Sequence, residues 1–145
     1  MKKISIIYWS DTGNTEIMAK AIQEGLEDVQ IELLRVGEAT VDNVLKADGV
    51  ALGCPSMGAE VLEEVEMEPF ITLLEKEDLK GKPMILFGSY GWGNGEWMDD
   101  WETRMKNIGI NLIDKGLIIE EEPNEEGILK CKELAMRLAA IVNNE

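Results

Sequence analysis

The sequence contains no histidine, so it lacks the usual general base at neutral pH and the commonest metal ligand. It has only two cysteines, Cys54 and Cys131, which stand far apart and without the spacing of a metal site. Each lies in an apolar pattern, and we expect both to be buried free thiols. The sequence therefore predicts neither a metal centre nor histidine-dependent catalysis.

Basic residues are scarce as well. Lysine and arginine together number 14 against 29 acidic residues, and the formal net charge is −15. Nucleic acids and anionic membranes are bound by basic patches, so we expect neither as a partner. An acidic surface suits a basic protein partner, because complementary fields accelerate encounter, although it can also serve solubility alone.

Long apolar runs are also missing. No stretch approaches the length of about 18 consecutive apolar residues that indicates a transmembrane helix. No apolar segment typical of a signal peptide follows the first lysines. We therefore expect a cytoplasmic protein. The 145 residues suit one domain with a substantial core, and no repeat or linker divides residues 1–145.

Strand-like apolar runs alternate with amphipathic helix patterns along the chain. The predicted strands are residues 4–9, 31–36, 49–53, 84–89 and 112–119, the last interrupted by Asp114-Lys115-Gly116. Four predicted helices lie between or after them: 15–26, one opened by Pro69, 97–108 and 128–142. This alternation predicts an α/β fold, a doubly wound five-stranded parallel sheet with helices on both faces.

Ligands of such sheets bind at the carboxyl ends of the strands, which selects the loops at 10–15, 55–60 and 90–95. The first loop joins a buried strand to a helix start and carries three hydroxyls, a typical anion site. It contains no lysine or arginine, so a phosphate there would be held by neutral dipoles. The same pattern can also be a helix cap without a ligand.

Each of the other two loops supplies one large apolar side chain next to glycine: a thioether in the second loop and an indole in the third. Met57 precedes Gly58 in the second loop, and Trp92 stands between two glycines in the third. Together with the first loop they predict a site for an aromatic nucleotide cofactor. The first loop lacks the lysine of a Walker A motif and does not read G-x-G-x-x-G.

Three motifs resemble the flavodoxin family, in particular the short-chain type of anaerobic bacteria, and the resemblance covers essentially the whole chain. They are Tyr8-Trp9-Ser10-x-Thr12-Gly13-Asn14-Thr15-Glu16, Leu52-Gly53-Cys54-Pro55-x-Met57-Gly58 and Leu86-Phe87-Gly88-Ser89-Tyr90-Gly91-Trp92-Gly93. The resemblance implies a flavodoxin-like sheet of strand order 2-1-3-4-5 and non-covalently bound FMN.

The resemblance also implies roles for individual residues. Met57 and Trp92 should pack on the two faces of the flavin, and Glu60 should accept a hydrogen bond from the flavin N3–H. The phosphate should be held by Ser10, Asp11, Thr12, Gly13, Asn14 and Thr15, and the remaining contacts should come from Pro55, Ser56, Gly58, Ala59, Ser89, Tyr90, Gly91 and Gly93. Asp11 departs from the family pattern, and we expect its side chain to point to solvent.

The function implied is a low-potential one-electron carrier that shuttles its FMN between semiquinone and hydroquinone. A peptide in the second loop flips in this family, and Gly58 can adopt the positive φ that the flip needs. Nearby carboxylates would disfavour the anionic reduced flavin and attract basic redox partners. They are Glu60, Glu63, Glu64, Glu66 and Glu68 after one loop and Glu96, Asp99, Asp100 and Glu102 after the other.

We expect such a carrier to be a monomer and not an enzyme. The alternative is an FMN-dependent NAD(P)H or quinone reductase on the same fold, although no basic cluster for a second nucleotide is evident. A phospho-acceptor signalling domain of the same topology is less consistent with the sequence. It needs acidic residues at the end of the third strand, which here ends in Cys54-Pro55.

Overall fold

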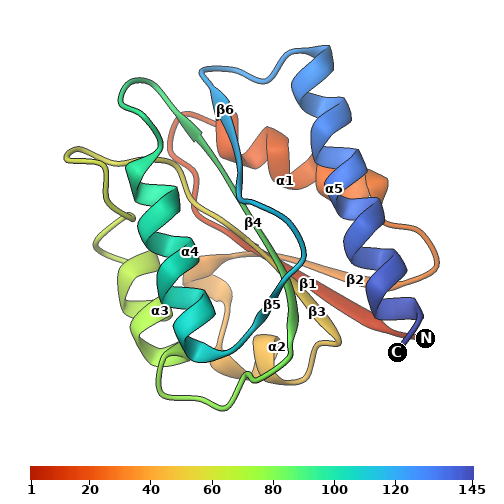
Figure 1. Cartoon of the computed structure of the whole chain (residues 1–145). Helices are drawn as coiled ribbons and strands as arrows, with labels where there is room; N and C mark the ends of the chain where they lie inside the picture. Colours follow the sequence, from red (N-terminus) through yellow and green to blue (C-terminus); the bar gives the residue numbers. More distant parts are fainter.

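A parallel sheet with helices on both faces forms the centre of the computed structural model, which describes residues 1–145 (Figure 1). Its strands are β1 (Lys3–Tyr8), β2 (Gln30–Arg35), β3 (Gly49–Gly53), β4 (Pro83–Tyr90), β5 (Asn111–Leu112) and β6 (Leu117–Glu120). The helices are α1 (Asn14–Gly25), α2 (Val41–Leu45), α3 (Met67–Leu74), α4 (Glu96–Ile108) and α5 (Glu125–Asn143), with a 3-10 turn, η1, at Val36–Glu38. The strand order β2-β1-β3-β4-β5 confirms the predicted fold.

Two predicted elements need correction. The expected fifth strand, 112–119, is divided into β5 and β6, which pair separately with β4 on either side of Asp114-Lys115-Gly116. Helix α2 was missed, so the chain has five α-helices instead of four. With five residues it is too short to show a helical period, but a capping box between Thr40 and Asn43 marks its start.

The three central strands are buried on both sides, as their continuous apolar runs predict. Alternate residues of β1 face opposite layers: Ile4 and Ile6 pack with α1 and α5, whereas Ile7 packs with the cluster formed by α2, α3 and α4. Strand β2 lies at the edge of the sheet and is only partly buried, which suits the alternation of polar and apolar residues in Gln30-Ile31-Glu32-Leu33.

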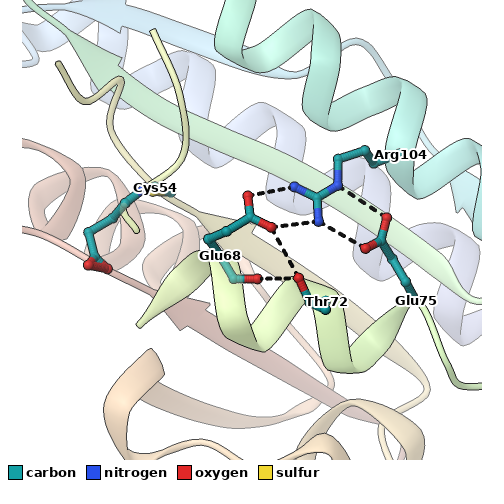
Figure 2. A network of polar contacts seen from close by, with 6 residues as sticks. Cys54, Glu68, Thr72, Glu75 and Arg104 are labelled. Atoms are coloured by element: carbon teal, nitrogen blue, oxygen red, sulfur yellow. Dashed lines mark hydrogen bonds and ion pairs between the residues drawn. The ribbon is translucent and has the colours of Figure 1, made fainter. Parts of the chain in front are cut away.

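The helices form two layers. Helices α1 and α5 lie side by side on one face of the sheet, and α3 and α4 cover the other (Figure 1). An arginine of α4 joins this second layer: Arg104 donates two hydrogen bonds to Glu68 and two to Glu75, both from the α3 segment (Figure 2). None of the helices is both long and apolar enough to cross a bilayer.

Strand register brings the three loops of interest together. Tyr8 of β1 lies beside Gly53 of β3, which in turn lies beside Phe87 of β4. Because all three strands run parallel, the loops that follow them emerge at the same edge of the sheet.

Candidate functional site

An open cleft lies at this edge. It is lined by the loops after β1 and β3, the first residues of α1, the end of β4 with the residue that follows it, and one residue after β6: Ser10, Asp11, Thr12, Asn14, Thr15, Pro55, Ser56, Met57, Ser89, Tyr90, Gly91 and Glu121. Eleven of these twelve were predicted from the sequence. The remaining one, Glu121, follows a strand that was not recognised as a separate element.

The loop after β1 presents unpaired backbone donors. Gly13, the N-cap of α1, has a φ of 103° and provides no side-chain cap. The Ser10 hydroxyl accepts the N–H of Glu16 at 3.2 Å, whereas the N–H groups of residues 11 to 15 have no acceptor within the chain. Five free donors at a helix N-terminus are suited to an anion. Asp11 is exposed and also lines the cleft, and the outward direction of its side chain stays a prediction.

Two buried hydroxyls hold the first loop against strand β4. Thr15 Oγ1 lies 2.8 Å from Ser89 Oγ, and the Ser89 N–H also points to Thr15 Oγ1 at 3.4 Å. Both residues are almost fully buried although they line the cleft. This pair links the start of α1 to the end of β4.

The second loop forms a small hairpin. Met57 and Val61 exchange backbone hydrogen bonds of 3.0 and 3.1 Å. The tip between them contains Gly58 with a φ of 36° and Glu60 with a φ of 55°. A β-carbon added at Gly58 would meet no atom within 4 Å, so glycine is needed there for its backbone conformation and not for space.

Glu60 joins the second loop to the third. Its Oε1 accepts the N–H of Gly95, the N-cap of α4, at 3.1 Å. Its Oε2 has no hydrogen-bond partner in the chain and is free to accept one from a ligand. Gly93 has a φ of 90°, which favours glycine, and a β-carbon there would displace the Glu60 carboxylate.

The tryptophans divide into two groups. Trp92 lies on the loop beside the cleft, and its side chain is 64% exposed instead of packing in the core. Trp97 and Trp101 are buried in the core. Trp97 also donates from Nε1 to the carbonyl of Cys54 at 3.1 Å, which holds the start of the second loop against α4.

Several predicted surface carboxylates are instead structural. Glu63 is only 4% exposed and accepts the N–H groups of Val65, Glu66 and Met67 at the start of α3. Glu102 is also buried and accepts the N–H of Gly116 at 2.7 Å. Together with Glu68, which pairs with Arg104, they are not free charges around the cleft.

The first loop contains no basic residue of its own, but the fold brings one next to it. Arg35, at the end of β2, donates from Nη2 to the carbonyl of Ser10 at 2.8 Å. Sequence reasoning missed this residue, because nothing in its local pattern distinguishes it from an exposed edge-strand arginine.

Six of the predicted residues do not line the cleft: Gly13, Gly58, Ala59, Glu60, Trp92 and Gly93. Gly13 shapes the backbone of the first loop, and the others form the tip of the second loop and the adjoining part of the third. The hydrogen bond between Glu60 and Gly95 places these two loops next to each other. Their direct contact with a ligand stays a prediction.

Comparison with known proteins agrees with this architecture. Residues 6–134 match the family model described as flavodoxin. A flavodoxin of Clostridium beijerinckii is 42% identical over 95% of this chain and 100% of its own, and one of Megasphaera elsdenii is 44% identical over 90% and 94%. Among solved structures, an archaeal flavodoxin superposes with a TM-score of 0.89 at 29% identity, covering 97% of this chain and 99% of the other.

Proposed function

The chain belongs to the flavodoxin family, and from this premise we propose that it binds FMN in the cleft between the loops after β1, β3 and β4. As a flavodoxin it is an electron carrier that uses FMN, not an enzyme. The observation that carries the proposed placement is the row of five unpaired N–H groups at residues 11 to 15, four of which belong to residues that line the cleft. We further propose that residues 1–145 act as one FMN-binding domain.

The chemistry of the cleft fits the two ends of the cofactor. The five N–H groups, with the hydroxyls of Ser10, Thr12 and Thr15, would hold the phosphate. At the other end, Met57 lines the cleft and exposed Trp92 stands beside it, so these side chains can cover the faces of the ring. The free Oε2 of Glu60 would accept the ring N3–H.

The same residues would set the reduction potentials. FMN supplies one- and two-electron chemistry when bound, and the protein determines how far the two steps are separated. Apolar cover from Met57 and Trp92 and negative charge from Glu60 and Glu121 would disfavour a further negative charge on the ring. We therefore propose that this chain works as a low-potential, one-electron carrier.

Absorbance spectroscopy tests this function directly. The purified protein should be yellow, contain one FMN per chain, and take up two electrons in two separate steps during reductive titration. It should not oxidise NADPH at a steady rate without an added acceptor. A colourless protein that fails to take up FMN would contradict the proposed cleft, and steady NADPH oxidation would favour the reductase alternative.

We propose that the protein is a monomer and that basic redox proteins dock at the acidic surface beside its cleft. Support comes from exposed Glu64 and Glu66 and from Val65 between them, which is 81% exposed. Attraction between opposite charges is screened by salt, so electron transfer to a basic acceptor should slow steeply as ionic strength rises. A rate independent of ionic strength would argue against this surface.

We also propose that the protein works in the cytoplasm. Both cysteines are free thiols in the structure, as is usual for proteins of a reducing compartment. Fractionation of cells that express the untagged chain would test this.

A further inference from the structure

Arg35 contacts both ends of the loop after β1. Its guanidinium carbon lies 5.5 Å from the centre of the Tyr8 ring, since Tyr8 and Arg35 are register partners at the ends of β1 and β2. Nη2 donates to the Ser10 carbonyl at 2.8 Å, and Nη1 lies 3.5 Å from Glu16 Oε1 in the first turn of α1. One side chain thus joins the strand before the loop, the loop's first residue and the helix after it.

The hydrogen bond to Ser10 determines the direction of the neighbouring N–H. In a trans peptide the C=O and the N–H point in opposite directions, and the chain has no cis peptide bond. Holding the Ser10 carbonyl toward Arg35 therefore turns the Asp11 N–H away from Arg35. Asp11 lines the cleft whereas Arg35 does not, so this N–H begins the row of unpaired donors.

The charge of Arg35 also favours an anion at this loop. A cation at the carbonyl end of a peptide polarises it and makes its N–H a stronger donor. The positive charge also lies behind the loop, where it opposes the repulsion that the carboxylates of Asp11 and Glu16 would exert on a phosphate.

We propose that Arg35 is a positioning residue for the FMN phosphate: from behind the loop, it orients and polarises the Ser10–Asp11 peptide so that the peptide donates to the phosphate. This inference rests on the proposed binding of FMN in the cleft. It assigns no direct contact between Arg35 and the cofactor.

The test compares ligands that differ only at the phosphate. Dissociation constants for FMN and riboflavin are measured by flavin fluorescence for the wild type, Arg35→Met and Arg35→Lys, all as full chains. Arg35→Met should bind FMN about tenfold more weakly, about 1.4 kcal/mol, and riboflavin within about twofold of the wild type. Arg35→Lys, which keeps a cationic donor, should recover most of the FMN affinity.

Lys20→Met is the matched control. Lys20 pairs with the same Glu16 at 3.1 Å but makes no hydrogen bond to Ser10, so its loss changes the charge without freeing the peptide. It should change FMN affinity by less than about twofold, and the Arg35→Met effect should persist at high salt. Inorganic phosphate provides a second probe: its ability to raise the melting temperature of the apoprotein should fall in Arg35→Met.

Several results would overturn the proposal. Equal weakening of FMN and riboflavin would mean that Arg35 supports the whole cleft. An effect that Lys20→Met reproduces and high salt abolishes would mean that only net charge matters. Unchanged FMN affinity in Arg35→Met, with FMN bound normally by the wild type, would remove the inference while leaving the proposed function intact.

Discussion

Thr15 Oγ1 and Ser89 Oγ lie 2.8 Å apart in the buried floor of the cleft, from segments 74 residues apart in the sequence. This contact ties the start of α1 to the end of β4 independently of any ligand. A buried hydroxyl that loses its partner costs about 1–3 kcal/mol, so the pair should contribute measurably to stability.

A double-mutant cycle on this pair can be followed by urea unfolding of the apoprotein. Thr15→Val leaves the Ser89 hydroxyl without a partner and should destabilise the fold by about 1–3 kcal/mol. Ser89→Ala should cost less, because the Ser89 N–H still points to Thr15 Oγ1. The double variant should lose less than the sum of the two by about 1 kcal/mol. Strict additivity would mean that the hydroxyls do not interact.

Gly58 should control the first reduction potential. Gly58→Ala introduces no clash but penalises a positive φ by about 1 kcal/mol. Because the peptide flip expected on the first reduction needs this φ, the penalty should fall on the reduced form and lower the first potential by tens of millivolts. Gly81→Ala is a matched control: Gly81 has a φ of 79° and also has open space, but it lies in the turn between α3 and β4, outside the second loop. It should lower stability but leave both potentials unchanged, as potentiometric titration can show. Equal potentials in wild type and Gly58→Ala would exclude this role.

Glu121 should make the second reduction step harder. Glu121 lines the cleft, so Glu121→Gln removes a negative charge from the proposed FMN site and should raise the second potential by on the order of 60 mV, a tenfold change for one electron. Glu122→Gln makes the same chemical change one residue further on, outside the cleft. Its effect should be clearly smaller, and equal shifts for the two variants would show that only net charge is sensed.

The contact of Arg104 with Glu68 and Glu75 should make stability depend on pH. Arg104 holds the pKa of the Glu68 carboxyl below its ordinary value of 4.5, chiefly through their hydrogen bond. A lowered folded-state pKa adds stability above 4.5, and that contribution is lost as the pH falls through the folded-state value. Because the carboxylates are partly exposed, solvent screens the gain to about 1 kcal/mol.

Unfolding of Arg104→Met by urea at several pH values tests this. Its deficit relative to the wild type should be largest near neutral pH and should shrink once the pH falls below 4.5. Arg137→Met, which removes a more exposed arginine paired with Asp114, should show a smaller deficit. A deficit of Arg104→Met that is constant with pH would point to lost packing instead of the ion pair.

Both cysteines should be unreactive in the folded protein. Burial raises the pKa of the Cys54 thiol and of the Cys131 thiol from 9.0 to about 12, so thiolate is scarce at neutral pH and the sulfurs are also inaccessible. Ellman's reagent should modify neither at an appreciable rate until urea unfolds the chain, when two thiols should react. Rapid modification of one thiol in the native protein would contradict its burial, and Cys131→Ala identifies which one.

Most of the fold was predictable because its signals are local. Continuous apolar runs marked β1, β3 and β4, and helix periodicity marked α1, α4 and α5. Short elements were the exceptions. Helix α2 spans too few residues for a period to emerge, and the turn at Asp114 was read as an interruption of one strand although it separates two.

Much of the cleft was predictable for a related reason. Parallel strands place their carboxyl ends at one edge, so loops recognised singly could be assigned to one site. Glu121 escaped this reasoning because it follows β6, which was not expected as a separate strand.

The sequence by itself determined the layered α/β fold, the three loops and the donors of the first loop, because each follows from residue type and short-range spacing. Only the tertiary structure decided which charges serve those loops. Arg35 reaches Ser10 across 25 residues because β2 pairs with β1, and Glu63 turns inward to hold the start of α3. Such contacts depend on strand order and side-chain direction, which residue spacing along the chain does not specify.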